Sequence, residues 1–159
     1  MNSRSLPPRR AFDPVDFPRA LSTLILCEVM QDAALCFRLV GTDMVEAWGA
    51  DFTGHRLQDI MQGDYHDFIR GLFDESIAKR APLFSHRRFQ WDRGRSLDTK
   101  RLMLPFARDD GNRADVGFVL VSQVFDYGKV GPCAPLVTSV EGGDFIELER
   151  ESLNVAAGD

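Results

Sequence analysis

Apolar and polar positions along the chain follow two different periods, and these periods predict an order of strands and helices. Residues 24–30 and 34–40 are mostly apolar runs of strand length, separated by a short polar turn. Two strands joined so closely form an antiparallel hairpin. Residues 42–49 and 57–61 then carry apolar side chains at helical spacing, and residues 64–79 form the longest such stripe. The pattern therefore predicts a strand hairpin followed by a cluster of mostly short helices.

After residue 82 the period shortens toward two. Residues 83–91, 97–106 and 116–125 are predicted as strands, separated by turn segments rich in glycine and in charged residues. Two strands, a helical insertion and three further strands make an α+β domain with a five-stranded antiparallel sheet. The helices inserted between the second and third strands are expected to cover one face of this sheet, with a cavity where they meet it.

Both ends of the chain differ in composition from its middle. Residues 1–22 contain four prolines and are predicted to form an arm with one short helical turn. Residues 128–159 form an acidic tail, in which residues 145–153 are a candidate helix after a pair of glycines. Residues 23–127 are the expected single domain.

The composition restricts the classes of function and the expected compartment. The 159 residues are 44% hydrophobic and include 12 phenylalanines, enough for one sizeable core. A net charge of −5 argues against general nucleic-acid binding, which normally needs a basic surface. Three cysteines without CxxC spacing predict neither a disulfide scaffold nor a structural zinc site. With no apolar run of roughly 20 residues and no secretory signal pattern, a cytoplasmic protein without a membrane span is expected.

The element order and three short motifs together resemble the PAS domain. Residues 37–42 read F-R-L-V-G-T and residues 48–54 read W-G-A-D-F-T-G. They are similar to the F-R-x-x-G-T and G-x-D-x-T-G motifs of a bacterial PAS subfamily. Residues 101–106, followed by an Asp-Asp-Gly turn, also resemble that subfamily. The resemblance covers residues 24–125 and implies the PAS fold.

The resemblance implies a role in sensing and signal transduction. PAS domains bind a small molecule or cofactor between sheet and helices, or mediate dimerisation and docking, and usually control a kinase, cyclase or DNA-binding domain. Since this chain has no room for such a domain, the expected partner is a separate signalling protein such as a kinase or regulator. The sequence contains no glycine-rich phosphate loop, nucleophile elbow or HExxH motif, so no enzyme activity is expected.

Known PAS cofactors need residues that this chain lacks or places elsewhere. A flavin photosensor of the PAS class requires an N-C-R-F-L-like motif on a helix, whereas Cys27 and Cys36 lie on the predicted hairpin. Haem-binding members use a histidine on the long helix, but His66 is expected to face solvent and His86 lies on the following strand. Flavin and haem are therefore disfavoured as cofactors, and no metal site is predicted. A small organic ligand remains a possible cofactor.

An apolar box with few polar residues is the predicted ligand site. Its apolar candidates, which ordinary core packing would explain equally well, are Met44, Trp48, Phe68, Leu72, Phe73, Leu102 and Leu104. His86 and Arg88 share a strand face and are the polar candidates for an anionic ligand, the alternative for Arg88 being a solvent-exposed strand arginine. Arg38 is expected to pair with Asp43 or Asp51 and so to fix the helical insertion.

These observations lead to three hypotheses for function. The first is a stand-alone PAS sensor or adaptor that acts as a homodimer. Its expected dimer contacts are the apolar N-terminal side chains Phe12, Val15, Phe17 and Leu21. The second is a protein-interaction module with a filled core and no ligand. The third is a haem-based gas or redox sensor. Whether the purified protein carries a bound molecule distinguishes the first hypothesis from the second.

Overall fold

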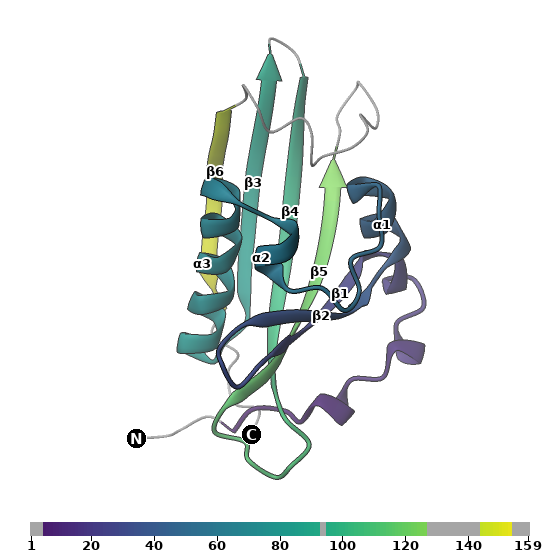
Figure 1. The fold of residues 1–159 in the computed structure, drawn as a ribbon, viewed down its shortest axis with the longest axis vertical. Helices are drawn as coiled ribbons and strands as arrows, with labels where there is room; N and C mark the ends of the chain where they lie inside the picture. Colours follow the sequence, from purple (N-terminus) through teal and green to yellow (C-terminus); the bar gives the residue numbers. More distant parts are fainter. Residues whose placement is uncertain (1–4, 93–94, 127–143, 154–159) are drawn as a thin grey trace.

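The fold is built on one antiparallel sheet of six strands. The computed structural model describes residues 5–92, 95–126 and 144–153, and the strand order within them is β2-β1-β5-β4-β3-β6 (Figure 1). The strands are β1 (Leu24–Val29), β2 (Leu35–Val40), β3 (Leu83–Asp92), β4 (Arg95–Ala107), β5 (Val116–Asp126) and β6 (Asp144–Ser152). Every neighbouring pair is antiparallel. The predicted α+β class is confirmed, with one strand more than expected.

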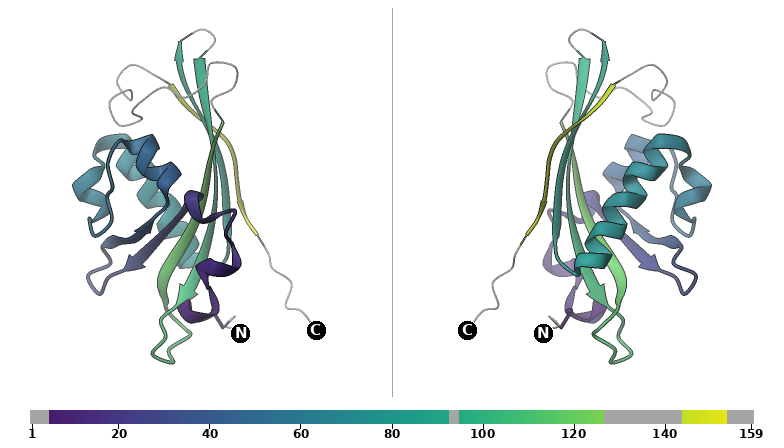
Figure 2. Two further views of the ribbon diagram at one scale, coloured as in Figure 1. Left: turned by 90° about the vertical axis from the view of Figure 1, so that its right-hand side faces the viewer. Right: turned by 90° about the vertical axis from the view of Figure 1, so that its left-hand side faces the viewer.

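The helices connect β2 to β3 and lie together on one face of the sheet (Figure 2). They are α1 (Thr42–Trp48), α2 (Leu57–Ile60) and α3 (Gly63–Lys79). The stripe that predicted α3 is its buried face, which carries Ile69, Leu72 and Phe73. Packing of this stripe against the sheet forms the main core.

The expected helix at residues 145–153 is wrong, because this segment forms β6 along the edge of β3. The register runs from Leu83 opposite Ser152 to Gln90 opposite Asp144. Polar and apolar residues alternate from Ile146 to Glu149, a period of two that suits a strand. The outer N–H and C=O groups of β3 provide hydrogen-bond partners that the isolated segment lacks, so the sheet selects the strand.

The N-terminal segment, residues 5–23, packs on the sheet face opposite the helices (Figure 2). It contains three short 3-10 turns, Arg9–Ala11, Pro14–Asp16 and Leu21–Thr23. The carbonyl of Pro7 accepts a hydrogen bond from the Ala107 amide at 2.8 Å. A second core forms beneath the segment from Phe12, Leu24, Leu26, Phe106 and Leu120. The part of the sheet around β1 and β5 therefore has apolar contacts on both faces.

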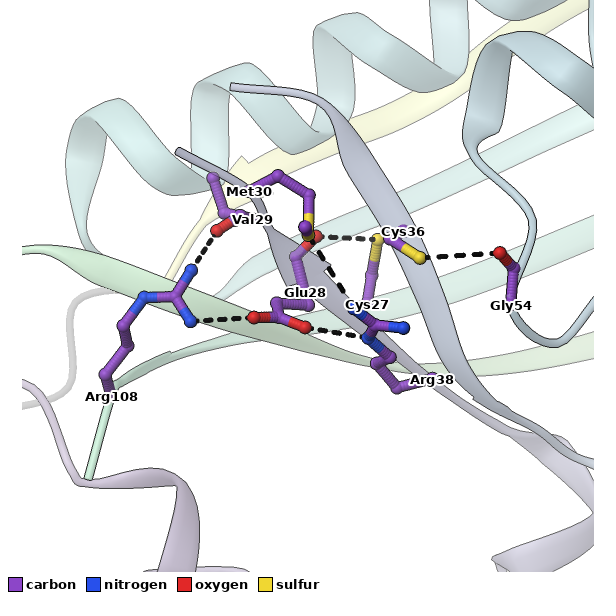
Figure 3. Close-up of polar contacts among 8 residues, drawn as sticks. All are labelled: Cys27, Glu28, Val29, Met30, Cys36, Arg38, Gly54 and Arg108. Atoms are coloured by element: carbon purple, nitrogen blue, oxygen red, sulfur yellow. Dashed lines mark hydrogen bonds and ion pairs between the residues drawn. The ribbon is translucent and has the colours of Figure 1, made fainter. Parts of the chain in front are cut away.

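Glu28 joins the hairpin to the end of β4 (Figure 3). Its carboxylate accepts from Arg38 Nε at 2.7 Å and from Arg108 Nη1 at 2.8 Å. The hydrogen bond from Arg108, followed by that from Arg38, lowers the pKa of Glu28. The expected pairing of Arg38 with Asp43 or Asp51 is wrong, because Arg38 lies at the bulge between β1 and β2 and reaches back across the hairpin.

Candidate functional site

A small cavity of about 30 Å³ lies between the helices and the sheet. Trp48, at the end of α1, lines the helical side together with Leu72 and Phe73 of α3. Met103 of β4 and Val121 of β5 line the sheet side. Because both layers contribute walls, a guest in the cavity contacts the helices and the sheet at once.

Aromatic side chains form one wall of the cavity. The ring of Trp48 lies 5.6 Å from that of Phe52 and 6.3 Å from that of Tyr65, between ring centroids. Phe37 of β2 packs edge-on against Phe52 at 4.8 Å. Aromatic pairs at such distances contribute about 0.5–1.5 kcal/mol each beyond their buried area. The pairs connect the end of α1, the following loop and the first turn of α3.

The polar part of the cavity is centred on Arg101 of β4, which is only 5% exposed. Its Nε donates to Gln123 Oε1 on β5 at 3.2 Å, and its Nη2 donates to the Tyr65 hydroxyl on α3 at 3.2 Å. A guanidinium carries five N–H donors, and these bonds use two of them. The Nη1 atom is buried and has no hydrogen-bond partner in the described part of the chain.

Within the described ranges, the charge of Arg101 has no acidic counterpart nearby. Among the described residues only Tyr65 raises the pKa of Arg101, and burial outweighs it and holds that pKa below the usual value. Arg87, on the same side of the sheet, lies 3.6 Å above the Phe68 ring, and burial lowers its pKa to about 10. Arginine stays protonated at neutral pH in proteins, so both guanidiniums are cationic, and Glu147 partly offsets the charge of Arg87.

Several of the predicted pocket residues lie at or beside this cavity. Trp48, Leu72 and Phe73 line it. Met44 and Phe68 belong to the same core but do not line the cavity. Met44 is fully buried under the helical cluster, where it packs as ordinary core.

The remaining four candidates, His86, Arg88, Leu102 and Leu104, lie on the opposite face of the sheet, so placing them in the pocket is wrong. Leu104 packs against the second core, whereas its neighbour Met103 belongs to the core under the helices. Leu102 shares the face of Leu104, and the β3–β4 register places His86 and Arg88 there as well. Since side chains alternate along a strand, the wrong choice of face for β4 also misplaced its partners on β3.

Asp98, rather than a ligand, is the anionic partner of Arg88 and His86. Arg88 Nε lies 2.6 Å from Asp98 Oδ1 and Arg88 Nη2 lies 2.9 Å from Oδ2. His86 Nε2 lies 3.0 Å from the same Oδ2. This bidentate arrangement is the strong form of an arginine–carboxylate pair, and it ties β3 to β4 on the outer face.

The Asp98 cluster predicts a pH-dependent contribution to stability. Arg88 first, and then His86, hold the pKa of Asp98 at about 2, below the value of about 3.9 in unfolded chains. A lowered folded-state pKa stabilises the fold above the unfolded value, and the contribution is lost as the pH falls through the folded value. We expect Asp98→Asn to lower the free energy of unfolding by about 1–2 kcal/mol at pH 6 and by much less near pH 2.

Urea unfolding of both proteins at the two pH values measures this effect. Asp16→Asn, at an exposed position in a turn of the N-terminal segment, is the matched control and should have little effect at either pH. An Asp98→Asn difference that is equal at both pH values would contradict the prediction.

Arg101 is the charged site residue that the sequence reasoning missed, together with its partners Tyr65 and Gln123. Its strand was predicted, but the face carrying Leu102 and Leu104 was assigned to the pocket. The available signal was a charged residue between Thr99 and Met103, on a face that is otherwise mostly uncharged. That signal becomes interpretable only when the helices are known to cover this face.

No cysteine or histidine side chain of the described residues lines the cavity. Cys27 and Cys36 are buried free thiols on β1 and β2 (Figure 3), and burial raises the pKa of Cys27 to about 12. Little reactive thiolate therefore forms on Cys27 at neutral pH. His66 is only partly exposed and lies 3.0 Å from Asp67, and no histidine lines the cavity. Within the described ranges, no three His, Cys, Asp or Glu side chains gather as metal ligands would.

The comparisons with known proteins support one family. A family model described as a PAS domain matches residues 1–120, more than half of the chain. Searches of the curated proteins and of the solved structures found no match. In the part of the chain that the structure describes, no helix is long and apolar enough to span a bilayer. The matched residues include all three helices and most of the cavity walls.

Proposed function

Because this chain belongs to the PAS domain family, we propose that its cavity binds a small molecule and that its N-terminal segment docks onto another protein chain. PAS domains are sensor or interaction modules and are typically not enzymes. In this proposal, occupancy of the cavity alters docking without any catalysed reaction. The downstream partner is a separate signalling protein, such as a kinase or regulator, in the bacterial cytoplasm.

The mostly apolar cavity beneath the helices, with one buried guanidinium in its wall, is the observation that carries the proposal. Protein interiors are close-packed, and the voids that stay empty are apolar. This void instead includes the guanidinium of Arg101, whose buried Nη1 has no partner among the described residues. A polar guest would lie beside that guanidinium and would touch α1, α3 and the sheet together.

The size of the cavity limits what it can bind. At about 30 Å³ the cavity accommodates only a small guest. Pockets for drug-sized ligands and cofactors measure about 300–1,000 Å³. Haem and flavin therefore do not fit this arrangement of helices and sheet, and the expected guest has a few non-hydrogen atoms.

The N-terminal segment presents the apolar surface for docking. Val15 is 78% exposed, Phe17 50% and Leu21 37%, whereas Phe12 is buried and its ring lies 5.6 Å from that of Phe17. Phe12 thus anchors the segment to the sheet while the other three side chains face outward. Apolar side chains gathered in this way are typical of an interaction surface, and a second copy of this chain is the proposed occupant.

We expect Val15→Glu to weaken the homodimer at least tenfold, because a carboxylate would be desolvated at the interface. Native mass spectrometry of the full chain measures the dimer fraction over a concentration series and, in the same spectra, any bound mass. Gln31→Glu, an exposed position in the β1–β2 turn, is the matched control. Deleting residues 1–22 is a poorer test, since it would also uncover the second core. An unchanged dimer fraction in Val15→Glu would remove the proposed docking surface.

A ligand-free interaction module is the second candidate function. The dense packing of the core around the cavity favours this function, since Leu35, Met44 and Leu57 are fully buried in the same cluster. This candidate predicts the bare chain mass in native spectra and no response to added small molecules. The sensor proposal predicts a saturable response.

A further inference from the structure

We propose that the cavity is a binding site for a small monoanion of the formate or acetate class, held by the guanidinium of Arg101. This inference rests on the proposed ligand-binding function and narrows it to one chemical class. Three features of the cavity support it: a buried cation with no acidic partner among the described residues, a guanidinium with a fixed orientation, and a volume that admits only small guests.

The first feature is the charge. A buried cation is costly unless it is paired, and buried arginines are normally paired with carboxylates or phosphates. The same fold shows the usual solution at Arg88, whose guanidinium is bidentate to Asp98. Arg101 is more deeply buried, yet within the described ranges no acidic side chain offsets its charge. A bound anion would supply the missing charge.

The second feature is the geometry of the donors. The bonds from Nε to Gln123 and from Nη2 to Tyr65 hold the guanidinium from two sides, one on the sheet and one on α3. Nη1 then remains as a buried donor without a partner in the described part of the chain. The guanidinium lines the cavity, so an oxyanion there would lie beside its positive charge with both of these bonds kept. The guanidinium is thus oriented before the anion arrives, which reduces the entropic cost of binding.

The third feature is the combination of size and wall chemistry. About 30 Å³ admits a guest of a few non-hydrogen atoms. The other walls include Trp48, Leu72 and Met103, which offer no further cationic group. A dianion such as sulfate would therefore lose its hydration with only one cation in the cavity to compensate, whereas a monoanion balances that cation.

Sodium formate is the probe, and Trp48 is the reporter because its ring lines the cavity. The full chain carrying Trp91→Phe has Trp48 as its only tryptophan, since the sequence contains two. Formate is titrated against sodium gluconate of equal ionic strength, because gluconate is too large for the cavity. We expect a saturable change in Trp48 fluorescence and a rise in the thermal midpoint of about 5 °C near saturation.

Variants separate the cavity from the protein surface. Arg101→Met in the same background should abolish both responses, whereas Arg113→Met, which removes an exposed arginine, should leave both unchanged. If Arg101→Met does not fold, Val121→Leu reduces the cavity while keeping Arg101, and it should weaken the formate response at least tenfold. A response that persists in both cavity variants overturns the inference.

A neutral probe of similar size distinguishes failure of this inference from failure of the proposed function. Formamide resembles formate in shape and lacks its charge. If wild-type protein binds formamide saturably and ignores formate, the monoanion assignment is overturned while the ligand-binding function gains support. If neither molecule binds, both the monoanion site and the small-molecule cavity are overturned, and the ligand-free module is favoured.

Discussion

Gly41→Ala is expected to lower the free energy of unfolding by about 3 kcal/mol or more. A Cβ atom at Gly41 would lie 2.3 Å from the carbonyl oxygen of Ser22 and 2.6 Å from that of Leu21. Both are backbone atoms, so no flexible side chain can move aside. The Gly41 amide also donates to the Leu24 carbonyl at 2.7 Å, which holds the strand end against the start of β1. Overpacking against rigid backbone belongs among the large destabilising effects of single substitutions.

The cost of Gly41→Ala is steric, because φ at Gly41 is −65°, an ordinary value for any residue. Gly71→Ala is the matched control, since a Cβ at that position of α3 meets nothing within 4 Å. Alanine in a helix interior is favoured over glycine, so Gly71→Ala should stabilise by about 0.5–1 kcal/mol. Urea unfolding should show a lower free energy of unfolding for Gly41→Ala and a higher one for Gly71→Ala. A loss below 1 kcal/mol for Gly41→Ala would contradict the close approach seen in the structure.

Leu72→Ala is expected to lower the free energy of unfolding by about 3–5 kcal/mol. Leu72 is 1% exposed and lines the cavity, so its removal enlarges a void that already exists. Truncation of a buried leucine loses both the transfer free energy and the packing of the surrounding atoms. The enlarged, mostly apolar void should also admit a small apolar probe such as benzene, detected as a raised thermal midpoint of the variant.

Leu102→Ala is the matched control for Leu72→Ala. Both leucines were pocket candidates from the sequence, but Leu102 is only partly buried on the outer face of the sheet. We expect a loss of about 1 kcal/mol and no benzene response, because this position opens toward solvent. Equal losses for the two variants in urea unfolding would contradict the assignment of the sheet faces.

Local patterns were sufficient where one element's own residues decide its structure. The apolar stripe of Ile69, Leu72 and Phe73 predicts both the helix and the side that it buries. The end of α1 was equally predictable, since Gly49 adopts a left-handed conformation with φ of 79° that favours glycine. Alternation likewise predicts that Arg101 and Met103 share one face of β4, opposite Leu102 and Leu104.

The candidate site was less predictable, because a two-residue period separates the faces of a strand without telling which face the helices cover. In this fold both faces are apolar, since Phe12 covers Leu24 and Leu26 on one side while α3 covers Met103 on the other. The sequence offered a pocket on either face, and the more continuous leucine face was the wrong one. His86 and Arg88 were assigned to the pocket because they share that face, but their partner in the structure is Asp98.

By itself, the sequence determined the family, the α+β class, the order of the elements and the long helix, because these depend on motifs and on periods read along one segment. The tertiary structure alone decided three further features. Pairing with the edge of β3 makes residues 145–153 a strand rather than a helix. The N-terminal segment packs on one face of the sheet, and the helices bury Arg101 on the other face. Each is a contact between segments far apart in the chain, and local periodicity carries no information about such contacts.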